Sequence, residues 1–322
     1  MYPLTRNFTA PAVLVLFSAA VTALQSWAGG VAVWMLWTNW AVTALLAFGV
    51  QDTLSRYYLG QVRNGAPFLV SWMVMSATVD YAMLHLPGDT APWLLLVAMV
   101  CLLMVLRIVL STWEQQYAVP SFFLLGLLVG GLSTLLPFVL GWLVLLPIVF
   151  YQMRAWSGRN AWSSLTGVVL GIWTVYCLLF LFGGEERADA MLRGYGRLLD
   201  IGLPVWPSLQ WQEWMFIAFF MLLLASYSMR SLLLVLGDNI RSRANSMMLA
   251  MLSLVVAVLS IADLGDIGFC LGLLSLFLSL QMCTYLANVR SSANEWWIFI
   301  LLVLFLLMSV LPTAFPLVMA FF

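Results

Sequence analysis

The chain of 322 residues is 64% hydrophobic and only 8% charged. A soluble domain carries about 25% charged residues, so this composition excludes a water-soluble globular protein and predicts a membrane protein. The 13 basic residues, all of them arginine, balance 13 acidic residues, and a net charge of zero argues against a nucleic-acid partner.

Long apolar runs set the expected architecture. Crossing a hydrocarbon core of about 30 Å takes about 20 helical residues, and only helices or closed barrels satisfy the backbone inside lipid. Because the runs are continuous rather than alternating, we predict an all-α bundle that forms a single transmembrane domain over residues 1–322. Eleven spans are expected, at residues 10–28, 31–50, 67–86, 92–112, 120–135, 137–153, 162–183, 211–236, 246–263, 267–288 and 296–316.

Prolines and asparagines mark the expected helix starts. Proline is tolerated in a first helical turn, and five prolines stand at the head of an apolar run: Pro11, Pro67, Pro92, Pro120 and Pro137. Pro147 lies inside the sixth expected span and should kink it. The related segments at 154–162, 239–248 and 288–297 suggest Asn160, Asn245 and Asn294 as N-caps of the helices that follow.

The third span, within SWMVMSATVDYAMLHLPGD at 71–89, contains a carboxylate at Asp80. A charge at the centre of a span costs about 2.5–3.5 kcal/mol by insertion scales, so Asp80 should face the bundle or a wet cavity. Ser76 shares its face one turn back, where another helix can approach. The lone histidine, His85, lies four residues after Tyr81 on the same helix.

The run RIVLSTWEQQYAVPSFFLLGLLVGGLSTLLPFVLGWLVLLPIVFYQMRAWSGRNAW at 107–162 contains a basic turn, a glycine-rich span, a second span and a basic loop. It resembles a group of uncharacterised multi-pass inner-membrane proteins of Bacteroidota, a likeness that extends over residues 30–180. The same segment is similar to the polyprenyl-linked (C-type) membrane glycosyltransferases, in which G-x-x-x-G-L, an apolar span and a basic loop recur. Those enzymes carry a catalytic carboxylate in the first outer loop, where this chain has QSWAGG. The resemblance therefore implies a related scaffold in a bacterial inner membrane rather than the same catalysis.

A short segment at about 185–201 breaks the apolar pattern. Its apolar residues recur at helical spacing and its charged residues fill the opposite face, which predicts an amphipathic helix at the outer interface. Such a helix either packs on the bundle and covers helix ends or forms a lid over a substrate.

The arginines give the orientation, because cytoplasmic loops are enriched in Lys and Arg. With the N-terminus inside, ten arginines fall on the cytoplasmic side and three on the outer side, and the C-terminus is outside. The positive-inside rule alone explains the inner arginines. The alternative is binding of lipid phosphates or a polyprenyl phosphate by Arg63, Arg154, Arg159, Arg241, Arg243 and Arg290.

The acids of the outer half give the candidate site. One hypothesis is that they converge on an outward-facing polar pocket able to act as a general base, bind a cation or carry protons; its members are Asp80, His85, Glu213 and Asp263. The other is that Asp80 is protonated or hydrogen-bonded to a neighbouring helix and that the remaining acids are ordinary interface charges. No sequence motif indicates a metal or a cofactor.

These features favour a non-catalytic or unclassified component of cell-envelope biogenesis that acts with lipids and other inner-membrane proteins. Two rivals stay open. The first is a glycosyl- or other group transferase that uses a lipid-phosphate donor at the outer face, with Asp80 as base. The second is a proton- or cation-coupled transporter. A transferase needs Asp80 and a second acid in one cavity, a transporter needs a path open from either side, and a scaffold needs neither.

Overall fold

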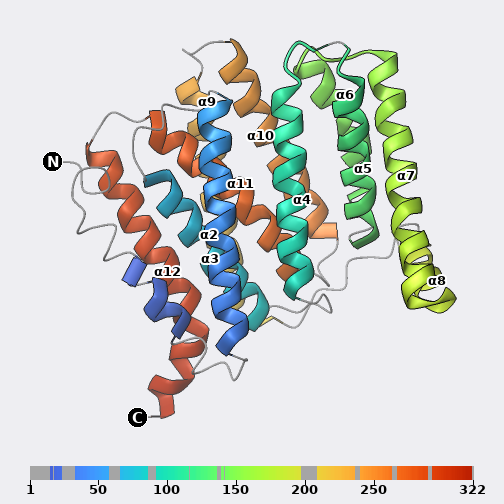
Figure 1. Cartoon of the computed structure of the whole chain (residues 1–322). Coiled ribbons are helices and arrows are strands. Elements are labelled where there is room, and N and C mark those ends of the chain that lie inside the picture. Colours follow the sequence, from blue (N-terminus) through green and yellow to red (C-terminus); the bar gives the residue numbers. More distant parts are fainter. Residues whose placement is uncertain are drawn as a thin grey trace. The chain divides into compact units, whose positions relative to one another are not determined.

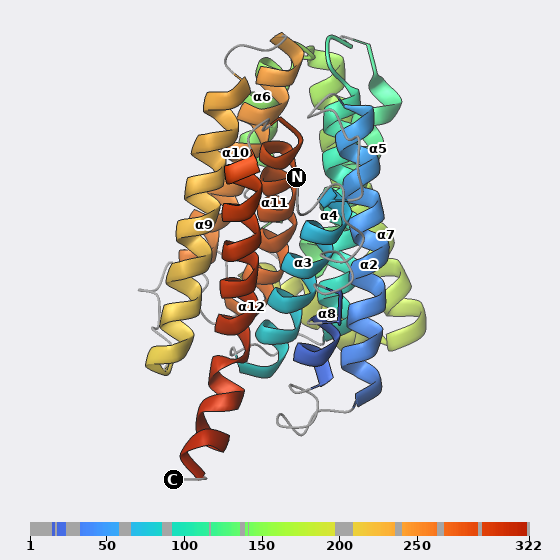
Figure 2. The same ribbon diagram turned by 90° about the vertical axis from the view of Figure 1, so that its left-hand side faces the viewer.

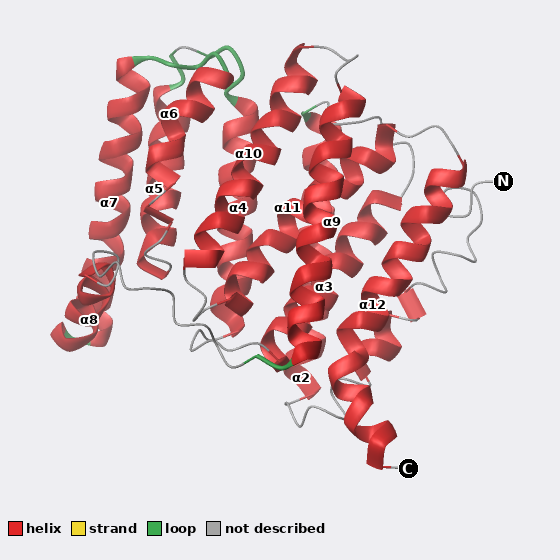
Figure 3. Ribbon diagram, turned by 180° about the vertical axis from the view of Figure 1, so that it is seen from behind, coloured by secondary structure: helices red, strands yellow, loops and turns green. Residues whose placement is uncertain are grey.

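The computed structural model describes residues 15–16, 18–23, 33–57, 66–85, 92–115, 117–135, 139–140, 142–196, 209–235, 240–262, 267–288 and 292–320. Every regular element in these ranges is helical, which confirms the all-α prediction (Figures 1 and 3). After helical residues at 15–16 and 18–23, the elements are α2 (Val33–Arg56), α3 (Ala66–His85), α4 (Pro92–Ser111), α5 (Val119–Leu135), α6 (Trp142–Gln152), α7 (Gly158–Gly183), α8 (Glu185–Gly196), α9 (Trp211–Val235), α10 (Ile240–Ala262), α11 (Ile267–Asn288) and α12 (Ser292–Ala320).

Within the described ranges, five helices are long and apolar enough to cross a membrane, as an integral membrane protein requires. They cover Ala66–His85, Trp93–Ser111, Gly158–Gly183, Trp211–Leu233 and Ile267–Ala287. Two shorter apolar helices cover Val119–Thr134 and Trp296–Leu311.

The chain divides into two compact units, and the division falls within α4. The first unit comprises Met1–Met99 and Val205–Phe322. Its centre is α11, whose apolar window is buried along its whole length. α3 packs on α11 and also against α2 and α12, as Figure 2 shows, while α9 and α10 pack on other parts of α11. Hydrogen bonds link α11 to α3: Ser279 Oγ lies 3.4 Å from the carbonyl oxygen of Ser71, and Cys283 Sγ lies 3.1 Å from that of Pro67.

The second unit, Val100–Pro204, is built on a close pairing of α5 with α7. Glycines make this approach possible. A Cβ atom on Gly126 would overlap the backbone of Ser164, and one on Gly130 would overlap the backbone of Val168. From the other side, a Cβ atom on Gly167 would collide with the backbone of α5. The two backbones therefore lie in direct contact, as small-xxx-small faces allow in membranes.

Within each unit, hydrogen bonds show which helix ends lie next to each other. In the first unit, Asn245 near the start of α10 donates to the carbonyl oxygen of Tyr57, just after the end of α2, at 3.0 Å. In the second unit, Ser163 near the start of α7 donates to the carbonyl oxygen of Val119, at the start of α5, at 2.8 Å. At the other end of α5, Ser133 is hydrogen-bonded to Tyr195 of α8 at 3.0 Å.

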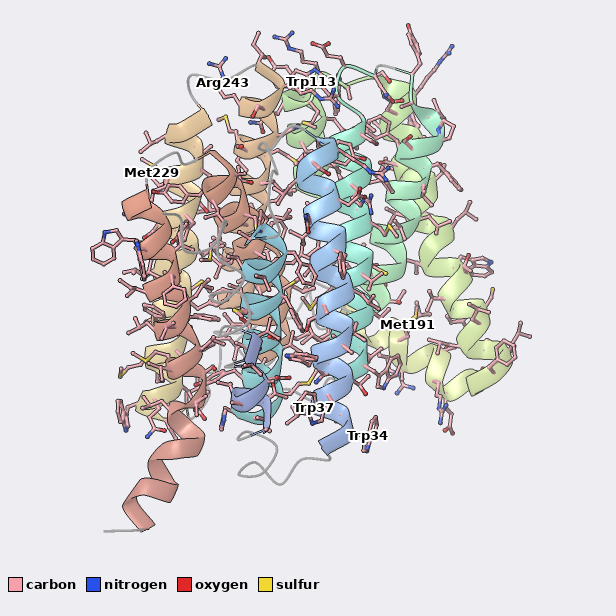
Figure 4. All side chains as sticks on the ribbon, turned by 60° about the vertical axis from the view of Figure 1, so that its left-hand side comes forward. Trp34, Trp37, Trp113, Met191, Met229 and Arg243 are labelled. Carbon is pink, nitrogen blue, oxygen red and sulfur yellow. The ribbon has the colours of Figure 1, made fainter. Side chains whose placement is uncertain are left out.

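Labelled side chains show the same two ends in Figure 4. In the first unit, Trp34 and Trp37 lie at the end opposite to Arg243, and in the second unit Trp113 lies at the end opposite to Met191. Gly184, with φ of +82°, makes the turn from α7 into α8, because glycine adopts a left-handed backbone without steric cost.

The proline markers are confirmed where the structure describes them. Pro92 begins α4, and Pro67 and Pro120 are the second residues of α3 and α5. Pro147 lies inside α6, which has only 11 residues. At 1.5 Å per residue this helix is about 16 Å long, so it is shorter than the element expected at 137–153.

The asparagine caps are wrong. Ser157 caps α7, with its side chain accepting from the backbone N–H of Asn160, and Nδ2 of Asn160 donates to the carbonyl oxygen of Ala155 at 2.9 Å. Asn245 and Asn294 fall inside α10 and α12 rather than before them. The amide of Asn245 is used in the tertiary contact with Tyr57, so this asparagine makes an interhelical contact and does not cap a helix.

Candidate functional site

Asp80 is buried between three helical segments of the first unit. Its side chain is 1% exposed, and Oδ2 accepts a hydrogen bond from Oγ1 of Thr22 at 3.4 Å. The amide of Asn39 in α2 interacts with the same carboxyl group, while its Nδ2 lies 2.7 Å from Sδ of Met83. Oδ1 of Asp80 has no hydrogen-bond partner in the described part of the chain. The carboxyl group is thus enclosed but incompletely satisfied.

Six polar residues continue this environment along the three helical segments, and we call them the polar seam. They form i, i+4 pairs, so each pair lies on one helix face. The pairs are Ser18 with Thr22, Asn39 with Thr43, and Ser76 with Asp80, and all six residues are at most 4% exposed.

Hydrogen bonds and rings hold the polar seam together. Trp40 donates through Nε1 to Oγ of Ser18 at 3.3 Å, and its backbone oxygen accepts from Nε1 of Trp72 at 2.9 Å. The two indole rings are 4.4 Å apart. The hydroxyl group of Thr43 donates to the carbonyl oxygen of Asn39 at 2.9 Å. Burying a polar side chain within a membrane costs free energy unless the side chain has such partners. These contacts therefore indicate that the polar seam is a specific arrangement.

Tyr81 and His85 face a different neighbour. The ring of Tyr81 stacks on Phe216 of α9 with centroids 3.7 Å apart, and the His85 ring lies 5.1 Å from that of Tyr81. Tyr81 also interacts electrostatically with Glu213. Glu213 itself lies in the first turn of α9: its Oε2 accepts from the backbone N–H of Gln210 at 2.7 Å, as in one half of a capping box.

The predicted site residues therefore divide into two groups. Asp80 points to Thr22 and Asn39, whereas His85 and Glu213 lie around Tyr81. Asp263 lies outside the described residues. Sequence reasoning missed Thr22 and Asn39, although a signal was present, because both are polar residues inside apolar runs of the first two expected spans.

The arginines proposed for phosphate binding are found in separate settings. Arg154 pairs with Glu114 through Nη1 at 3.3 Å, and its guanidinium lies 6.0 Å from the ring centre of Trp113. Arg159 and Arg243 are exposed, and Arg241 is half-buried. Arg63 and Arg290 lie outside the described residues. The structure thus gives Arg154 a protein partner and leaves Arg159 and Arg243 at the surface.

A second polar network lies in the same unit and joins three helices. Gln281 of α11 accepts at Oε1 from the hydroxyl group of Ser228 in α9 at 2.6 Å. Its Nε2 donates to Oγ of Ser253 in α10 at 3.0 Å. Both ends of one buried amide are therefore used, which identifies this network as a structural link between helices.

Comparison of the chain with protein-family models, with curated proteins and with solved structures finds no match.

Proposed function

We propose that the protein is a proton- or cation-coupled membrane transporter in which Asp80 is the ion-carrying group. One observation supports this function above the others. Asp80 is 1% exposed within the helical bundle, yet the hydrogen bond that it accepts from Thr22 is 3.4 Å long, and its Oδ1 has no hydrogen-bond partner in the described part of the chain. Ionisable residues inside membranes mark ion and proton pathways when they face the bundle interior.

A purely structural role for Asp80 is less well supported. A structural carboxyl group would be expected to receive short hydrogen bonds, since each buried polar atom left unsatisfied costs about 1–3 kcal/mol. Gln281 illustrates the satisfied case, with bonds of 2.6 and 3.0 Å at its two ends. The weak satisfaction of Asp80 is instead the state expected for a group that exchanges a ligand.

The transferase hypothesis receives less support from the same contacts. It requires Asp80 and a second acid to face one cavity, but Glu213 caps α9 and neighbours Tyr81, while Asp80 faces Thr22 and Asn39. We therefore keep coupled transport as the main proposal.

The proposed setting is the bacterial inner membrane, with eleven spans and a cytoplasmic N-terminus. Contacts inside each unit support the alternation that this threading needs. The end of α2 lies beside the start of α10, near Arg241 and Arg243, and Arg154 lies beside the start of α7. The amphipathic α8 lies at the opposite end of α7. Arginines thus gather at one end of each unit, which agrees with the positive-inside rule.

A second candidate function is a component of cell-envelope biogenesis that acts with membrane partners. The exposed face of α7 favours this function, because only 17% of the apolar window of the helix is buried and large apolar side chains cover the exposed part. Trp162, Trp173 and Phe182 are 60–86% exposed. A photo-crosslinker at residue 173 should then give a discrete protein adduct in cells, whereas one at the buried Val168 should not. Lipid adducts alone at residue 173 would remove this support.

Charge displacement tests the main proposal without knowledge of the transported substrate. The purified full-length protein would be reconstituted in liposomes on a solid-supported membrane and exposed to rapid pH or cation jumps. Binding of an ion within the bilayer moves charge, so the wild type should give a transient current. Asp80→Asn should abolish that current, and Asp80→Glu should retain part of it.

The matched control is Asp52→Asn, which makes the same chemical change at a partly exposed carboxylate 2.6 Å from Arg56. Its current should equal that of the wild type. A wild type that gives no current with any ion, or a current that survives in Asp80→Asn, would overturn coupled transport through this residue.

A further inference from the structure

We infer that Asp80, Thr22 and Asn39 form a binding site for a monovalent cation of the size of Na⁺. This inference rests on the proposed function and deepens it by naming the coupling ion. The three side chains come from three helical segments of one compact unit, and all three are at most 2% exposed. A cation bound between them would link those segments from within the bundle.

The distance between the two facing oxygens supports a shared cation. Oγ1 of Thr22 and Oδ2 of Asp80 are 3.4 Å apart, whereas O–H···O hydrogen bonds are usually about 2.5–3.0 Å long. Two oxygens at right angles around a metal ion and 3.4 Å apart each lie about 2.4 Å from it, a distance typical of a large hard cation and longer than the roughly 2.1 Å of Mg²⁺. The pair is too far apart for a good hydrogen bond and well spaced for adjacent ligands.

The charge of the site favours a monovalent ion. Asp80 supplies a carboxylate to the proposed site, and the other two side chains, Thr22 and Asn39, supply a neutral hydroxyl group and a neutral amide. One positive charge on the bound ion would cancel the carboxylate inside the bundle. A divalent ion would leave a net charge buried, which carries a penalty of several kcal/mol in a low-dielectric interior.

The chemistry of the ligands points the same way. Carboxylate, hydroxyl and amide oxygens are the ligands of hard cations rather than of transition metals. Rotation of the Asn39 amide exchanges its oxygen and nitrogen, so this side chain can offer Oδ1 to the cation. The unsatisfied Oδ1 of Asp80 supplies a further oxygen that is already buried at the site.

The other half of the polar seam supports these ligands from one turn away. Thr43 donates to the carbonyl oxygen of Asn39 and so fixes the turn that carries the amide. Ser76 lies one turn before Asp80 and Ser18 one turn before Thr22, and both are buried. These hydroxyl groups extend the polar surface along the helices, which lowers the cost of moving a cation to or from the site.

The test uses the same supported membranes at fixed pH, with sodium chloride jumps balanced against choline chloride. The wild type should give a saturable transient current with Na⁺, and the larger K⁺ should require a higher concentration. Asp80→Asn should abolish the Na⁺ current. Thr22→Val should raise the half-saturating Na⁺ concentration at least about tenfold, as loss of a metal-site partner does, while Thr22→Ser, which keeps the hydroxyl group, should stay close to the wild type.

The matched control is Thr78→Val. Thr78 is also fully buried, but its hydroxyl group donates to the carbonyl oxygen of Val74 in its own helix at 2.7 Å. Its Na⁺ affinity should be unchanged. If Thr22→Val does not fold, the unfolding midpoint of the wild type provides the test. A ligand that binds only the folded state raises this midpoint as the ligand concentration increases. Sodium should then raise the midpoint and choline should not.

The outcomes separate this inference from the proposed function. A current that follows pH jumps but not Na⁺ jumps would overturn the sodium site and leave proton coupling at Asp80 standing. A Na⁺ current that is unchanged in both Thr22→Val and Asp80→Asn would place cation binding elsewhere and overturn the inference. No response to either jump would overturn both proposals together.

Discussion

The α5–α7 pair and the core around α11 are held together in opposite ways. In the α5–α7 pair, glycines let two backbones touch, and the outer face of α7 is left exposed. In the core of the first unit, α11 is buried along its entire apolar window and carries polar side chains that bond to neighbouring helices. One region uses close approach, and the other uses hydrogen bonds between side chains.

The difference illustrates what stabilises helix association in lipid. Lipid tails are as apolar as leucine, so apolar burial alone does not drive two helices together. Close packing of small residues and interhelical hydrogen bonds remain as the main contributions. The α5–α7 pair should therefore be sensitive to added volume, and the α11 core to lost polar groups.

The largest effect is expected from Gly126→Ala combined with Gly130→Ala. Each added methyl group would overlap backbone atoms of α7, and overpacking of this kind typically costs about 1–3 kcal/mol. Steric-trap or SDS-unfolding measurements on the purified protein would report the loss. Gly131→Ala is the matched control, because a Cβ atom there has open space. Equal destabilisation by Gly131→Ala would contradict the role of backbone contact.

A smaller effect is expected from Gln281→Leu, which removes both interhelical bonds of the amide. Such bonds are worth about 0.6 kcal/mol on average in membranes and at most about 1.7, so we expect a loss of about 1 kcal/mol in the same assay. Ser253→Ala should lose part of this amount. Ser275→Ala should lose little, because its hydroxyl group bonds within α11 to Gly272 at 2.6 Å. If Gln281→Leu left the stability unchanged, hydrogen bonds between side chains would not distinguish the α11 core from the α5–α7 pair.

The smallest effect concerns the link between α5 and α8. The hydroxyl hydrogen of Ser133 goes to the carbonyl oxygen of Gly130 at 2.7 Å, so Tyr195 donates to Ser133. Tyr195→Phe should raise the amide-exchange rate of α8 severalfold, consistent with a bond worth about 0.5–1.5 kcal/mol, and leave α5 unchanged. Ser133→Ala should have the same effect, and the double variant should add nothing.

The same tyrosine predicts a pH dependence. Burial raises the pKa of Tyr195. A folded-state pKa above that of the unfolded chain gives a contribution that is complete below about pH 10, the ordinary tyrosine pKa, and is lost as the pH rises further. Tryptic cleavage after Arg193 should therefore stay slow up to about pH 9 and then accelerate. Acceleration near pH 7 would contradict this ordering.

Much of the helix pattern was predictable from the sequence. Apolar runs bounded by prolines placed α3, α4 and α5 within a residue or two, because a missing N–H is harmless only in a first helical turn. The glycine spacing in LLGLLVGGLSTLL is typical of close helix packing in membranes, but it does not tell that Gly131 points to open space while Gly126 and Gly130 touch α7. That distinction depends on which face of α5 the partner helix covers.

The surroundings of Asp80 were less predictable. Helical spacing placed Ser76 on the same face as Asp80, but the partners of Asp80 come from residues 58 and 41 positions earlier in the chain. A single sequence carries no direct record of which spans touch. Glu213 shows the reverse case, because a Glu three residues after Gln210 is a local capping pattern that the sequence contained.

The late position of α11 in the chain has a consequence for biogenesis. Its contacts with α3 join residues separated by 208 and 216 positions. During synthesis the ribosome therefore delivers α3, with Asp80, long before the helix that becomes its main packing partner exists. Until residues 267–288 have been inserted, the polar groups of α3 must be sheltered by lipid headgroups, by an insertase or by incomplete contacts. A chain that stops before α11 would leave α3 without this partner and expose it to membrane proteases.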